Sequence, residues 1–243
     1  DLSGKDLTGT ILTGADLTGT VLRGADLTDA NLAGIDLSGR DLTGTILTGI
    51  DLSGKDLTGT ILTGADLTDA NLSGQDLSYM DFSHANLVGA DITGTILDKT
   101  KFNNANLEGV NLQNANLKLA EFIDVDFTKI KNKSLAGSDL TSASFAHSNL
   151  SGVNLSDAIM DDTNFWKANL SDQDFTVISD ASIEGATFLE SNLSNSNFEG
   201  VNLSPKYEYS TIFKNKAYLM QQSELFDEKT IREDLFGKYT RVL

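Results

Sequence analysis

The chain has no cysteine, one proline, one tryptophan and two histidines among its 243 residues. Without cysteine it forms neither disulfides nor thiolate metal sites, and His84 and His147 are too few for a histidine metal cage. No apolar run approaches the ~20 residues that a membrane-spanning helix needs, and no basic-then-apolar signal segment opens the sequence. We therefore expect a cytoplasmic protein with no cofactor, no metal and no membrane partner.

Basic residues are also scarce. The chain carries 18 Lys and Arg against 35 Asp and Glu, which gives a formal net charge of −17 at pH 7. Such a charge is repelled by the phosphates of nucleic acids, so it argues against direct binding to DNA or RNA. It favours solubility or a basic protein partner.

Apolar residues recur every five positions along most of the chain. They run from Leu2 to Phe127, from Leu135 to Phe175 and from Ile183 to Leu203, and all 40 of these central residues are Leu, Phe, Ile or Met. A period of five fits neither the 3.6 of a helix nor the 2 of a strand, so the chain must turn at a fixed interval. The residues between are rich in Asp, Asn, Ser, Thr and Gly, which favour turns. The pattern predicts a solenoid with the central residue, and the small residue two positions before it, pointing inward.

The repeating unit contains the motif Ala-Asp/Asn-Leu. Examples are Ala15-Asp16-Leu17, Ala30-Asn31-Leu32, Ala105-Asn106-Leu107 and Ala168-Asn169-Leu170. This motif resembles that of the pentapeptide-repeat family. The resemblance implies an all-β solenoid, a right-handed quadrilateral β-helix with four pentapeptides per coil and about ten coils over residues 1–203, a rod about 48 Å long at the spacing of β-strands.

The frame of five slips twice, near 128–134 and near 176–182, where the step between central residues is eight. We interpret each slip as a three-residue bulge at a corner that leaves the order of the sides unchanged. In that register one side carries a column of phenylalanines, namely Phe82, Phe102, Phe122, Phe145, Phe165 and Phe188. Three inward positions hold cations instead of small residues, Lys5, Arg40 and Lys55, and we expect their charged ends to leave the core at corners.

The period ends at Leu203, and residues 204–243 form a separate segment. Asp227 is a suitable N-cap and Gly237 a suitable stop for a short helix near 227–236. This segment is either a cap on the solenoid or a homodimer interface. The residues available for either role are Leu225, Phe226, Ile231, Leu235 and Phe236.

Three sets of residues are candidates for interaction with a protein partner. Trp166 directly follows a central residue and should point outward, as an interface anchor or as a partly covered surface residue. The first bulge carries Lys129, Lys131 and Lys133, which could contact an acidic partner or simply be solvated. A third set, spaced four pentapeptides apart, should form an outward row of carboxylates, either functional or a solvated face: Asp16, Asp36, Asp56 and Asp76.

The sequence offers no nucleophile elbow, phosphate loop or acid–base set, so we expect no enzyme and no catalytic residues. The leading hypothesis is a non-enzymatic interaction scaffold or rod-like spacer. The first alternative is an acidic DNA mimic that inhibits DNA gyrase, as the resemblance to the quinolone-resistance members of the family implies. With 17 net charges the rod has one charge per ~2.8 Å, against one per ~1.7 Å in duplex DNA. The second alternative is a repeat module of a larger bacterial effector.

Overall fold

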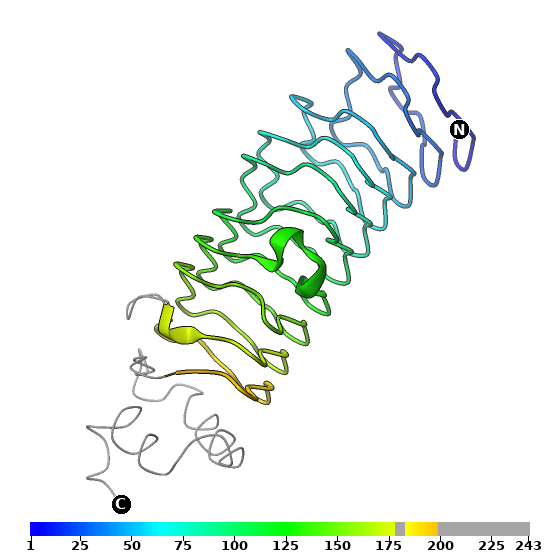
Figure 1. The fold of residues 1–243 in the computed structure, drawn as a ribbon. Helices are drawn as coiled ribbons and strands as arrows, with labels where there is room; N and C mark the ends of the chain where they lie inside the picture. The colour runs from blue at the N-terminus through cyan, green and yellow to red at the C-terminus, as the bar shows by residue number, and fades with distance from the viewer. Residues whose placement is uncertain (178–182, 199–243) are drawn as a thin grey trace, which may run out of the picture.

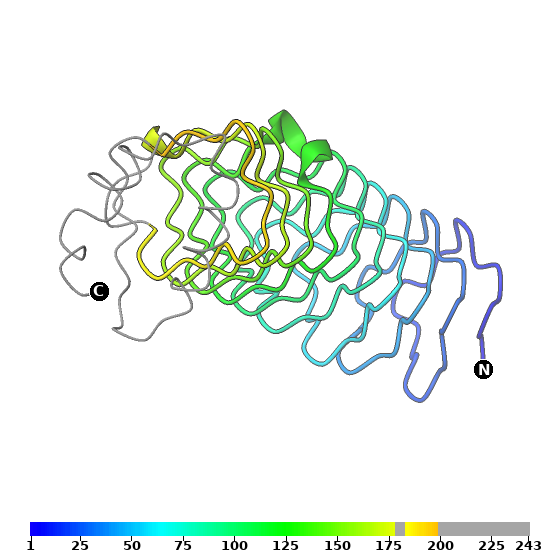
Figure 2. The same cartoon turned by 90° about the horizontal axis from the view of Figure 1, so that it is seen from below.

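The computed structural model describes residues 1–177 and 183–198. Over these residues the backbone winds into stacked coils that form an elongated rod (Figure 1). The view from below shows the successive coils lying one on the next (Figure 2). The solenoid expected from the period of five is therefore present. Residues 204–243, with the helix and the five cap or dimer residues expected there, lie outside the described part of the chain.

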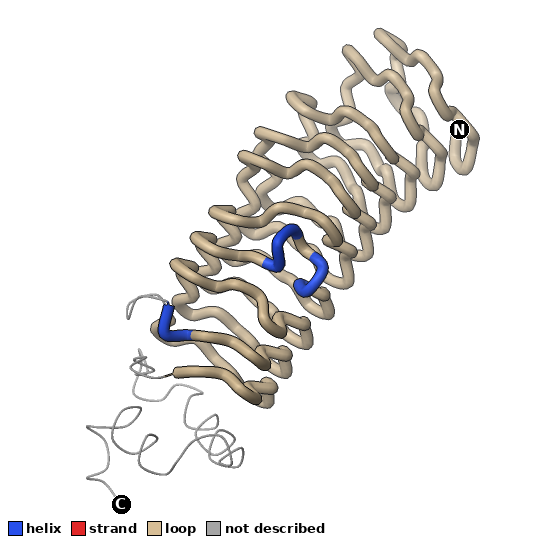
Figure 3. The backbone as a smooth tube through the Cα atoms, in the orientation of Figure 1, coloured by secondary structure: helices blue, strands red, loops and turns tan. Residues whose placement is uncertain are grey.

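Neighbouring coils are joined by parallel backbone pairs that are each one residue long. Asp6 pairs with Asp26, Asp26 with Ile46, and Ile46 with Asp66. Each of these steps spans four pentapeptides, so four pentapeptides make one coil. The chain turns too often for extended strands, and turns and loops dominate the tube in Figure 3. The regular elements of the described residues are three short 3-10 helices: η1 (Phe127–Lys129), η2 (Lys131–Lys133) and η3 (Phe175–Val177).

A tight turn closes most of the pentapeptides. The central carbonyl accepts a hydrogen bond from the backbone N–H three residues later, as in the 2.9 Å bond from Thr60 N to Leu57 O. The residue before the donor has positive φ, which is 70° at Gly59. A positive φ at the third residue of a turn is typical of type II turns and favours Gly or Asn. This requirement explains the frequent Gly, Asn and Asp at this position, which we call the left-handed turn position.

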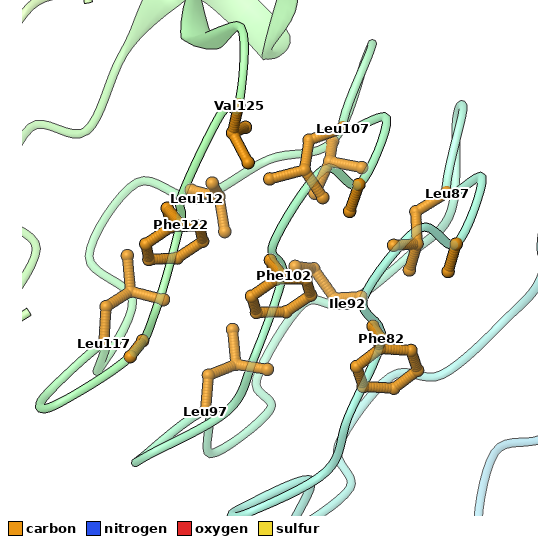
Figure 4. Packing of buried hydrophobic residues seen from close by; sticks show 14 of the residues in the cluster. Phe82, Leu87, Ile92, Leu97, Phe102, Leu107, Leu112, Leu117, Phe122 and Val125 are labelled. Atoms are coloured by element: carbon orange, nitrogen blue, oxygen red, sulfur yellow. The ribbon is translucent and has the colours of Figure 1, made fainter. Parts of the chain in front are cut away.

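The central side chains point into the coil, where they pack against those of neighbouring coils (Figure 4). The predicted phenylalanine column forms along one side, with ring centroids 5.1 to 5.5 Å apart and nearly parallel rings. Phe127 adds an edge contact to Phe122 at 5.2 Å. Burial of these side chains is the main source of stability, because each removes a large apolar surface from water.

The parallel pairing of neighbouring coils continues in the same register on both sides of each slip. Asp126 pairs with Asn149 and Asn164 pairs with Thr187, so the step is four pentapeptides and three more positions where a slip intervenes. Ser134 pairs with Asn154, where the step is again four pentapeptides. Each slip therefore lengthens one coil by three positions and keeps the order of the sides. The first addition is η1 and η2, and most of the second, 178–182, lies outside the described residues.

The three cations at inward positions behave differently from one another. Lys5 is exposed, as predicted, and Arg40 is half-buried. Lys55 contradicts the prediction, because its part-buried Nζ donates a 2.7 Å hydrogen bond to the Leu32 carbonyl of the preceding coil. Gln75 makes the equivalent bond one coil later. The central carbonyls therefore accept polar groups at inward positions, which reduces the cost of placing them there.

Candidate functional site

Trp166 lies at the corner that follows the phenylalanine column, with its side chain 38% exposed. The His147 ring stands nearly perpendicular to the indole at a centroid distance of 4.9 Å, and Lys167 Nζ lies 4.7 Å from the centroid of the Trp166 ring. Lys167 also pairs with Glu190 across 3.5 Å. We call these four residues, Trp166, His147, Lys167 and Glu190, the Trp166 corner. The cation and the neighbouring aromatic ring hold the indole in place and leave part of it exposed.

Apolar residues extend the Trp166 corner along the rod. Backbone hydrogen bonds between coils place Ile123, Ala146 and Leu189 at the same position of neighbouring coils as Trp166. Ala146 is buried, while Ile123 and Leu189 are half-buried. The result is an apolar stripe rimmed by charged groups, on a backbone held by coil-to-coil bonds. An exposed, pre-positioned Trp inside a charged rim is the usual form of an interface anchor.

The lysine bulge lies at another corner. Lys129, Lys131 and Lys133 are all exposed on η1 and η2, and among the described residues they form no ion pair. The bulge follows the side that contains Phe127, whereas the Trp166 corner precedes that same side two coils later. The structure therefore does not bring the lysines and Trp166 into one site. The exposed amines leave both the partner-binding and the solvated interpretation of the bulge open to test.

The carboxylate row is exposed, and it consists of Asp16, Asp36, Asp56 and Asp76. Each of these carboxylates accepts a hydrogen bond from the backbone N–H two residues later, within its own turn. Asp36 Oδ1 accepts hydrogen bonds from Ser38 Oγ at 2.7 Å and from Ser38 N at 2.9 Å. The side-chain bond and then the backbone bond lower the pKa of Asp36 below its usual value, and all four carboxyls are lowered in the same way. Hydrogen bonds to the charged form have this effect. These groups are therefore ionised at neutral pH.

A pair that the sequence reasoning missed lies on the corner after Leu77. Lys99 Nζ donates a 2.7 Å hydrogen bond to Tyr79 Oη and lies 4.7 Å from the centre of its ring. Both residues occupy left-handed turn positions, with φ of 58° and 65°. Tyr79 and Lys99 occupy the same position in pentapeptides one coil apart, and this spacing of 20 residues could have predicted the contact from the sequence.

Other chemistry has little support among residues 1–177 and 183–198. They contain no group of three or more His, Cys, Asp or Glu placed to hold a metal ion. Within the same residues, no helix has the length and apolar character to cross a membrane. His84 and His147 share one corner but are separated by the coils that carry Asn104 and Asp124, so the two imidazoles do not meet.

Comparison with known proteins gives one family and several similar structures. A family model described as pentapeptide repeats matches residues 1–39, 41–74, 65–104, 100–131, 135–176 and 177–204. HetL, a pentapeptide repeat protein involved in heterocyst differentiation regulation in the cyanobacterium Nostoc, is 26% identical with a TM-score of 0.58, over 83% of this chain and 88% of HetL.

A second similar structure is that of trypsin-treated QnrB1, a plasmid-mediated fluoroquinolone resistance protein. It is 15% identical with a TM-score of 0.50, over 90% of this chain and 97% of that chain. At this identity the likeness concerns the fold alone. The comparison with curated proteins gives no significant match.

Proposed function

Because the chain belongs to the pentapeptide-repeat family, we propose that it is a non-enzymatic scaffold that binds a partner protein in the cytoplasm. In this proposal residues 1–203 form a right-handed, four-sided rod of about ten coils, and 204–243 cap it or join two copies. The stacked coils support this role, since a column of interlocked rings and backbone bonds gives a stiff body that can hold a partner at a set distance.

The Trp166 corner is the observation that carries the proposal. Its indole is partly exposed, held by His147 and Lys167, and flanked by apolar residues of the neighbouring coils. A partner that covers this side chain would remove a large apolar surface from water with little loss of conformational entropy. Truncation of such an anchor typically costs about 2 kcal/mol or more of binding free energy.

Affinity capture with the full chain as bait tests the anchor. A true partner binds the native chain and an Ile159→Ala variant, and is lost with Trp166→Ala. Ile159 is a suitable control because it is a similarly exposed apolar side chain, at 40% against 38% for Trp166. Capture of the same proteins in the same amounts by the Trp166→Ala chain would refute the anchor.

A second candidate is a DNA mimic that binds a topoisomerase, and the carboxylate row favours it. Because turn hydrogen bonds lower the pKa of Asp16, Asp36, Asp56 and Asp76, the row stays negative at neutral pH. The net charge of −17 corresponds to about 60% of the charge density of duplex DNA along the rod. Inhibition of DNA gyrase supercoiling at micromolar concentration or below would favour the mimic over the scaffold, and no inhibition at high concentration would exclude it.

The homodimer through 204–243 is tested separately by light scattering. The full chain is expected to have the mass of two copies, and a chain ending at residue 203 the mass of one. Identical masses per chain for the two proteins would exclude a dimer interface in this segment.

A further inference from the structure

One side of the rod is fully paired between two of its middle coils. Leu77 N donates a 2.9 Å hydrogen bond to Ile96 O of the next coil. Tyr79 N donates an equivalent 3.0 Å bond to Asp98 O. These two bonds close this side between the two coils, as a parallel ladder should.

The same side is open one coil earlier. The equivalent donors are Leu57 N and Gly59 N, and the equivalent acceptors are Asp76 O and Ser78 O. In the described part of the chain, neither of these donors bonds to either acceptor. A groove of about 850 Å³ lies at this place, lined by residues of both coils. One lip therefore presents backbone N–H groups and the other presents backbone carbonyls.

The adjoining corner of the groove carries long polar side chains. Its inward position is Lys55 in one coil and Gln75 in the next, whereas later coils have Ala115 and Ala158 there. Both long side chains run between coils to reach a central carbonyl of the preceding coil. In the following coil the residue is Thr95, whose hydroxyl bonds locally, and the ladder closes.

The walls of the groove are charged and apolar. Asp56 and Asp76 stand on its two lips as exposed carboxylates. Among the residues that line the groove, Lys55 carries the positive charge, and its ammonium group is already hydrogen-bonded to the Leu32 carbonyl. Ile61 and Tyr79 are 45% and 68% exposed and add apolar contact area. An occupant that matches these features is extended, positively charged and partly apolar.

We propose that this groove binds an extended, lysine- or arginine-rich segment of a partner protein, which pairs its backbone with both lips. The segment would accept hydrogen bonds from Leu57 N and Gly59 N and donate to Asp76 O and Ser78 O, as an added strand does at a free sheet edge. Its cations would lie against Asp56 and Asp76. This site is separate from the Trp166 corner, and its failure would leave the proposed function untouched.

Amide hydrogen exchange tests the opening itself. The N–H groups of Leu57 and Gly59 should exchange at least about tenfold faster than those of Leu77 and Tyr79, because only the latter pair bonds to the next coil. Equal protection of the two pairs would mean that the groove is closed in solution. That result would overturn the proposal.

Peptide binding tests the occupant. A fluorescein-labelled octapeptide of alternating Lys and Val should bind the full chain saturably by anisotropy, and its Glu–Val counterpart should not. The Lys–Val peptide with alternate amides N-methylated should bind at least about tenfold more weakly, since backbone pairing is lost. Equal binding of the methylated peptide would overturn the pairing.

Variants separate the groove from general attraction to an acidic rod. The double variant Asp56→Asn/Asp76→Asn should bind about fivefold more weakly, the size expected of exposed ion pairs. A control with the same charge change on other sides, Asp6→Asn/Asp91→Asn, should bind as the native chain does. Equal weakening in the control would mean that only net charge attracts the peptide.

Discussion

The phenylalanine column makes a quantitative prediction about stability. Phe122 contacts three rings: Phe102 at 5.2 Å, Phe145 at 5.1 Å and Phe127 at 5.2 Å. Phe82, at the start of the same column, contacts only the Phe102 ring among the described residues, at 5.5 Å. Both side chains are fully buried, so burial does not distinguish them.

Replacing each by Leu isolates the ring contacts. Leu is sterically acceptable, because Leu22, Leu42 and Leu62 occupy the same position in earlier coils. Each aromatic pair contributes about 0.5–1.5 kcal/mol beyond burial, so Phe82→Leu should cost about 1 kcal/mol and Phe122→Leu about 2–3 kcal/mol.

Urea unfolding followed by circular dichroism measures both losses. Hydrogen exchange in individual coils guards against local unfolding, which repeat proteins allow. Equal losses for the two variants, or a larger loss for Phe82→Leu, would refute the view that stacking of rings stabilises the later coils.

Three further predictions concern single turns and buried polar groups. The pKa of Asp36 is lower in the folded state, so the unfolded state takes up this proton first as the pH falls. The contribution of Asp36 to stability is therefore present above pH ~4 and disappears below it. The Asp36→Asn variant keeps the acceptor of the turn and should remove this part of the pH dependence of the urea midpoint. At φ 67° Gly64→Ala should cost about 1 kcal/mol in urea unfolding. Gly89→Ala should cost only slightly more, since the exposed Asp69 carboxylate must turn away from the new Cβ, and this small excess should vanish with Asp69→Gly. Thr163→Val loses a buried 2.9 Å bond to a carbonyl of the preceding coil and should cost about 1 kcal/mol by the same measurement.

The sequence identifies Trp166 and the lysine bulge as candidate interaction residues, but it does not predict their contacts or their relative positions. The sequence predicts that Trp166 points outward, because it follows a central residue. Its contacts with Lys167 and with His147 of the preceding coil depend on side-chain directions that a period of five does not specify. The sequence also predicts the lysine bulge, but its separation from Trp166 by one side of the coil needed the register of two coils.

The sequence by itself determined the solenoid, its turns and its column of phenylalanines. These features depend on a local pattern of five residues, which occurs 40 times, and each copy favours the same turn and the same inward side chain. Only the tertiary structure decided where the long inward side chains end. Lys55 and Gln75 differ from Ala115 in length, and a long side chain can leave through a corner or bond to a carbonyl of the coil before it. Which of these occurs depends on groups a full coil away in the chain, and therefore on how the coils pack.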